Sequence, residues 1–141
     1  MEKEDVVLVT HDTILNFPKK VEKPFVEFLS KERFSHYLDL LEVKKHLDFT
    51  PCFVASMKGG DVVFICLEII NDLTKNLSSQ KKILFVEAII LHELFHIWNN
   101  IQVKKKNDLY LSEALVHEEL ELMYPEHAKL LGKFTKHRKK H

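Results

Sequence analysis

A chain of 141 residues has room for one folded domain with a genuine core, and not for two. Its composition, 45% hydrophobic and 30% charged, excludes a disordered or fibrous protein. The 21 Lys and Arg residues balance the 21 Asp and Glu residues, so we expect neither nucleic acid nor an anionic membrane as a partner. We expect a single domain over residues 1–141, ending in a basic tail at about residues 133–141.

The first residues and the longest apolar stretch favour a cytoplasmic protein. The N-terminus, residues 1–5, is charged, and no apolar stretch long enough for the hydrophobic region of a signal peptide follows it, which is not the pattern of a secretory signal. The longest apolar stretch, residues 83–91, contains Glu87 and is too short to span a bilayer. We therefore expect no membrane partner.

The two cysteines do not form a disulfide framework. If Gly59 and Gly60 turn a hairpin, Cys66 pairs across from Phe53. Cys52 then points to the opposite face, and a bridge would need a shift in register. Reduced thiols are the expectation.

The first elements are a short strand and a long helix. Weak alternation of apolar residues predicts the strand at residues 6–10. Residues 24–47 carry apolar side chains at three- and four-residue spacing, which predicts a helix that begins at Pro24. Within it, Ser30 is in a position to cap a second helical segment.

A hairpin and three helices are expected after that. Residues 53–56 and 62–67 flank a glycine-containing turn, which is typical of a hairpin. The first helix is predicted from Ser78 or Ser79 to about residue 101, and a polar loop follows it at residues 104–108. The second helix is predicted at residues 109–123, and the third begins at Pro125. Strands before helices predict an α+β fold, with a small antiparallel or mixed N-terminal sheet, a long helix and a C-terminal helical part.

The predicted helix at residues 79–101 carries the motif His92-Glu93-Leu94-Phe95-His96. Two histidines four residues apart stand one above the other on a helix, so both imidazoles can reach one Zn²⁺. Glu93 is rotated by one residue and reaches a metal-bound water, whose proton it can accept. The polar residues from position 92 onward share about a third of the circumference of an otherwise apolar helix, which indicates a cleft. They are His92, Glu93, His96, Asn99 and Asn100.

A catalytic zinc needs a third protein ligand and an open fourth position. Glu113 lies on the next predicted helix, beside small and apolar neighbours that suggest a packed position. His117 is on the same face, four residues on, and could ligate instead or sit behind the ligands. Glu118 is the third choice, after Glu113 and His117.

Here the sequence resembles the gluzincin clan of zinc metallopeptidases, through His-Glu-Leu-Phe-His and the later Leu-Ser-Glu-Ala-Leu. The specific part of the resemblance covers residues 83–123, and the small size is similar to the minimal members called minigluzincins. The resemblance implies a zincin-like fold in which His92, His96 and Glu113 bind one Zn²⁺. It implies that Glu93 is the general base and acid for hydrolysis of a peptide or protein substrate.

The same resemblance implies further features. An extended substrate would pair with the strand at residues 62–67, as an edge strand. Some members steady the oxyanion with a Tyr or His beyond the ligand helix. The candidates for this role are Tyr110, His117, Tyr124 and His127. Nothing local decides among them, and Tyr124 and His117 are the ones we predict to be catalytic. Minigluzincins are also latent, and the basic tail, with His137 or His141, could block the cleft.

Three interpretations stay open at this point. The first is a zinc peptidase, in an active or latent form. The second is a catalytically silent zinc-binding scaffold or interaction protein, and the third is a basic-tailed nucleic-acid binder in which the motif is incidental. Apolar surface from Trp98 and from the Phe-rich N-terminal half could also pair two copies into a homo-oligomer.

Overall fold

The computed structural model describes residues 1–41, 51–102 and 109–134, with side chains for 1–41, 51–100 and 113–134. These ranges form helices packed around a three-stranded sheet, so the predicted α+β class is confirmed. In chain order the elements are α1 (Lys3–Leu15), β1 (Phe25–Phe28), α2 (Lys31–Leu40), β2 (Cys52–Met57), β3 (Gly60–Ile65), α3 (Leu67–Thr74), α4 (Ser79–Gln102), α5 (Leu109–Met123) and α6 (Pro125–Phe134).

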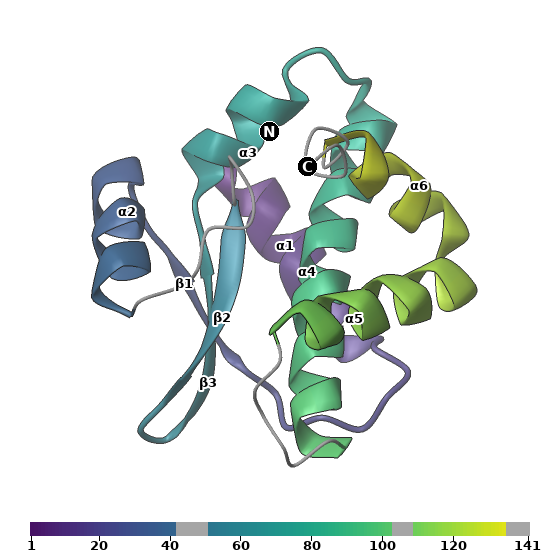
Figure 1. Cartoon of the computed structure of the whole chain (residues 1–141). Helices are drawn as coiled ribbons and strands as arrows, with labels where there is room; N and C mark the ends of the chain where they lie inside the picture. Colours follow the sequence, from purple (N-terminus) through teal and green to yellow (C-terminus); the bar gives the residue numbers. More distant parts are fainter. Residues whose placement is uncertain (42–50, 103–108, 135–141) are drawn as a thin grey trace.

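The elements form layers on the two faces of the sheet (Figure 1). The strand order is β1-β3-β2, with β1 parallel and β2 antiparallel to β3. One face packs against α2, in an aromatic cluster that includes Phe34, Phe53 and Phe64. The other face supplies Val63 and Ile65 to the larger core, which also contains side chains of α1, α4, α5 and α6.

Helix α4 is the centre of the larger core. It contacts α1, α5, α6, α3 and β2, and Figure 1 shows it between the sheet and the C-terminal helices. A helix surrounded in this way must be apolar on most of its circumference. Its buried residues include Phe85, Val86, Ile90, Leu94 and Phe95, each at most 1% exposed. Polar residues on such a helix therefore need partners from the neighbouring elements.

The C-terminal half of the prediction is confirmed. Helices α4 and α5 and the start of α6 at Pro125 lie where the sequence places them, with α4 ending one residue later than expected. The expected loop at residues 104–108 lies outside the described residues. Among the described residues, no helix is both long enough and apolar enough to cross a membrane.

The strand predicted at residues 6–10 is wrong, because this segment belongs to α1. Val6, Thr10 and Ile14, spaced four residues apart, are the buried residues of the helix. This spacing places one stripe against α4, and packing of that stripe outweighs the β propensity of the valines.

The helix predicted from Pro24 is also wrong at its start. Phe25–Phe28 form β1, which pairs with β3, and its side chains alternate between exposed and half-buried. The predicted cap at Ser30 is confirmed, because its hydroxyl accepts a hydrogen bond from the Arg33 amide at the start of α2. Helix α2 ends at Leu40, and residues 42–47 of the predicted helix lie outside the described residues.

The hairpin is confirmed, but its register differs from the expected one. Met57 pairs with Gly60, so the turn is centred on Lys58 and Gly59 rather than on the two glycines. Gly59 has φ 104°, a left-handed conformation that favours glycine. Phe53 consequently faces Phe64 and not Cys66.

The two cysteines nevertheless lie on opposite sides of the sheet. Cys52 belongs to the larger core and Cys66 to the aromatic cluster under α2. Both are buried and free, as expected.

The role of residues 62–67 as a substrate-binding edge is contradicted. Strand β3 is the central strand and is hydrogen-bonded on both sides, so it has no free edge. Residue 67 is not in the strand either, since it begins α3, a helix that is not among the predicted elements. The edge strand that contacts α4 is β2.

Candidate metal centre

His92 and His96 lie one turn apart on the side of α4 that faces α5. Their ring centroids are 4.8 Å apart and their planes are nearly perpendicular. The side chains are 13% and 11% exposed, so most of each imidazole is withdrawn from water. The apolar residues around them fix α4 in the core and hold both rings toward the neighbouring helix.

Glu113 is the residue of α5 that meets both histidines. Its Oε1 lies 2.7 Å from Nε2 of His96, and its Oε2 lies 3.5 Å from Nε2 of His92. One ligand atom from each of the three residues lies within 4.8 Å of the other two, a group that could hold a metal ion. It is the one such group of three or more among the described residues. The structure thus brings together the three side chains that the sequence predicts as ligands.

The charges of this group are strongly coupled. Burial alone would lower the pKa of His92, but its hydrogen bonds with Glu113 and Glu93 raise that pKa to about 10. Burial alone would raise the pKa of Glu113, but hydrogen bonds from His117, His92 and His96 hold it well below the usual carboxyl range. The carboxylate of Glu113 therefore stays ionised, and it attracts positive charge to the point where the nitrogens converge.

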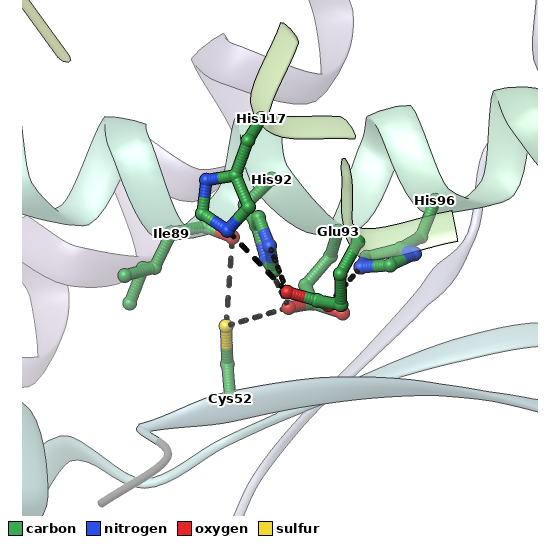
Figure 2. A network of polar contacts seen from close by, with 7 residues as sticks. Cys52, Ile89, His92, Glu93, His96 and His117 are labelled. Carbon is green, nitrogen blue, oxygen red and sulfur yellow. Dashed lines mark hydrogen bonds and ion pairs between the residues drawn. The ribbon is translucent and has the colours of Figure 1, made fainter. Parts of the chain in front are cut away.

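Glu93 is the buried carboxylate beside the group, only 7% exposed. Nδ1–H of His92 donates to its Oε2 at 3.1 Å. The thiol of Cys52, on the edge strand β2, lies 3.9 Å from the same oxygen and 3.6 Å from the carbonyl oxygen of Ile89 (Figure 2). Burial and the nearby Glu93 charge raise the pKa of Cys52 well above its ordinary value, so the thiol stays protonated and can donate.

The sequence does not predict the contact between Cys52 and Glu93. Cys52 lies 41 residues from Glu93, and only the packing of β2 on α4 brings the two side chains together. The alternation along residues 52–57 indicates which face Cys52 occupies, but not which turn of α4 it meets. No local spacing in the sequence carries that information.

His117 lies on the rim of the group. Its Nε2 is 3.4 Å from Oε2 of Glu113, and its ring centroid is 5.4 Å from that of His92. His117 belongs to α5, and a dashed line in Figure 2 joins its ring to a carboxylate oxygen. The side chain is 44% exposed and does not belong to the group of three ligand atoms. Glu118, the third choice as ligand, is exposed.

The other oxyanion candidates lie in a second polar cluster. Tyr124 packs against Phe95 and against His127, at centroid distances of 6.4 and 5.4 Å. His127 donates from Nε2 to Glu87 at 3.0 Å. Burial and the Glu87 charge raise the pKa of Tyr124. Within the described part of the chain, no polar contact joins Tyr124 to the His92 group, and its catalytic role stays a prediction.

The remaining candidates fall outside what the structure describes. Tyr110 lies in α5, but its side chain is not described. The same holds for the basic tail from residue 135, including His137 and His141. Blocking of the cleft by the tail is therefore untested.

Comparison with known proteins gives no match to a family model, to a curated protein or to a solved structure. The chain is thus characterised by its own geometry. That geometry is an α+β fold whose His92, His96 and Glu113 are consistent with a His-Glu-x-x-His motif followed by a ligating Glu.

Proposed function

We propose that this chain is a zinc-dependent hydrolase that cleaves peptide bonds, with His92, His96 and Glu113 as the metal ligands. The donor set of two imidazole nitrogens and one carboxylate oxygen suits Zn²⁺ and is typical of catalytic rather than structural sites. The observation that carries the proposal is the carboxylate of Glu93, buried to 7% exposure directly beside that set. Burying a carboxylate costs free energy, so a buried carboxylate beside a set of metal ligands is a candidate for a catalytic role.

In this proposal each side chain has a separate task. Zinc held by these ligands would supply a Lewis acid, which polarises a carbonyl oxygen and makes water nucleophilic at neutral pH. His92 and His96 offer neutral nitrogens and Glu113 offers a negative oxygen. Glu93 accepts the proton of the attacking water and returns it to the leaving amide nitrogen.

The sheet suggests how a peptide would be held. Strand β2 is an edge strand, and its residue Cys52 touches Glu93. An extended peptide added to the outer edge of β2 would run alongside the carboxylate that acts on it. This replaces β3, which has no free edge, as the strand that pairs with substrate.

A catalytically silent zinc-binding scaffold is the second candidate, and one observation favours it. Oε2 of Glu93 is engaged by His92 and approached by the Cys52 thiol. A carboxylate held in this way at rest must be released before it can serve as a base. The zinc site would be the same in both functions, and only the role of Glu93 differs.

The test is Glu93→Gln, which keeps the shape of the side chain and removes the base. Zinc content and hydrolysis of an unfolded protein substrate are measured beside the wild type and Glu118→Gln, an exposed glutamate of α5. We expect unchanged zinc in all three proteins and a loss of about 10²–10⁴-fold in kcat for Glu93→Gln alone. A zinc-loaded wild type without hydrolysis would favour the scaffold, and full activity in Glu93→Gln would refute the proposed mechanism.

A further inference from the structure

The two oxygens of Glu113 have different surroundings. Oε1 has a short contact of 2.7 Å with His96, whereas Oε2 is 3.4 Å from His117 and 3.5 Å from His92. Three imidazole nitrogens, all Nε2, thus converge on one carboxylate. Two of them come from residues of the ligand group, and the third, from His117, does not.

His117 is well placed to act on Glu113. The two residues are four apart on α5, so their side chains lie on the same face of one helix. Its other described contact is with the ring of His92 at 5.4 Å. Its side chain is 44% exposed, more than any of the three ligands, so this histidine can form and break its contact without disturbing the core.

We propose that His117 is a positioning residue, which holds Oε2 of Glu113 so that only Oε1 is presented to the metal. This inference rests on the proposed zinc site and adds a residue that controls the binding mode of its third ligand. A carboxylate can bind a metal through one oxygen or through both. With both oxygens bound, the position that a catalytic zinc keeps open would be filled. An Nε2–H donated by His117 to Oε2 keeps that oxygen engaged and the position open.

Cobalt(II) in place of zinc makes the prediction measurable without an activity assay. Four-coordinate cobalt absorbs more strongly in the visible range than five-coordinate cobalt, so absorption reports whether Glu113 binds through one oxygen or two. The proteins to compare are the full chain as wild type, His117→Ala, His117→Gln and His11→Ala. Glutamine retains an N–H donor at similar reach, and His11 is an exposed histidine of α1, outside the group.

We expect His117→Ala to bind cobalt about 10–100-fold more weakly, because Glu113 loses the hydrogen bond that orients it. Each bound ion should also absorb less, because Glu113 becomes free to bind through both oxygens. His117→Gln should restore both affinity and absorption toward the wild-type values, and His11→Ala should match the wild type. The rescue by glutamine separates positioning from a merely structural role of the imidazole.

Two results would overturn the inference while leaving the zinc site intact. One is a His117→Ala protein whose affinity and spectrum equal those of the wild type. The other is an equal loss in His117→Ala and His117→Gln, which would show that the imidazole itself is needed, as a ligand or for packing, since an amide N–H replaces neither. A wild type that binds no cobalt at all would refute the proposed function, and this inference with it.

Discussion

Helix α4 takes part in histidine–glutamate contacts with two neighbouring helices, and the two contacts differ in the number of imidazoles per carboxylate. Toward α6, one imidazole faces one carboxylate, with His127 donating to Glu87 at 3.0 Å. Toward α5, the single carboxylate of Glu113 faces the Nε2 atoms of three imidazoles. The residue types are the same in both, and both join α4 to a neighbouring helix.

The difference shows what distinguishes a metal site from a structural contact. In the Glu87–His127 pair each partner satisfies the other, and the pair ties α6 to α4. Around Glu113, three imidazole nitrogens face the two oxygens of one carboxylate. A second carboxylate, Glu93, lies buried beside them. A divalent cation would bind the surplus nitrogens and balance the negative charge. The predictions below test whether the two contacts really differ in this way.

The largest expected effect is on metal affinity. His96→Ala removes one of two nitrogen ligands, and we expect zinc binding to weaken by more than the roughly 100-fold that loss of an outer hydrogen bond can cause. His127→Ala removes a histidine of similar burial, 17% exposed against 11% for His96, from the contact between α6 and α4. It should leave zinc affinity unchanged. Competition with a chromophoric zinc chelator measures both constants. Equal losses in the two variants would erase the distinction between the two contacts.

The pH dependence of zinc binding is the next largest effect. The pKa of His92 is raised to about 10, so near neutral pH its ring is protonated until a metal displaces the proton. Apparent affinity should therefore rise with pH, by about tenfold per unit for one displaced proton, up to about pH 10. Calorimetry in buffers of different ionisation enthalpy counts the released protons. Affinity that is constant between about pH 6 and pH 8 would contradict this.

The same shifts bear on the stability of the fold when no metal is bound. The raised pKa of His92 stabilises the folded chain fully below about pH 6.5, the usual histidine value, and the contribution is lost as the pH rises through about 10. The lowered pKa of Glu113 stabilises the fold above the usual glutamate range, and this contribution is lost as the pH falls below it. Urea unfolding of the metal-free chain should show the free energy of unfolding falling as the pH rises toward 10. With zinc present, the free energy of unfolding should instead rise with pH.

The smallest effect concerns the pair of Glu87 and His127. Glu87→Gln weakens a partly exposed contact, with side chains 37% and 17% exposed, and should lower the free energy of unfolding by about 1 kcal/mol or less. Zinc content and hydrolysis should not change. Urea unfolding and metal analysis of the same sample give both answers. A change in zinc content would show that Glu87 and His127 influence the metal group.

The sequence predicts the site better than it predicts the N-terminal half, for physical reasons. The ligands lie on long helices whose ends carry clear signals, such as the cap at Ser78 and the following Pro125. The spacing of His92 and His96 has meaning only on a helix. The requirement for a third ligand points to the next helix, where Glu113 is the first choice ahead of His117 and Glu118. All of these depend on local spacing.

The failures depend instead on tertiary contacts. Phe25–Phe28 is a strand because β3 lies beside it, although Pro24 and the apolar spacing are compatible with a helix. The segment at residues 6–10 is helical because α4 offers a surface for Val6 and Thr10. The approach of Cys52 to Glu93 depends on both the hairpin register and the docking of the sheet on α4. Spacing along one chain does not encode these contacts directly.

The measurement that tests the central claim most directly is the metal content of the purified chain, beside His92→Ala and Glu113→Ala. The account predicts about one zinc per wild-type chain, held by three protein ligands, and its loss in both variants. A wild-type chain that takes up no zinc after incubation and desalting would contradict the account. It would leave the convergence of imidazoles on Glu113 as a structural feature of the α4–α5 contact.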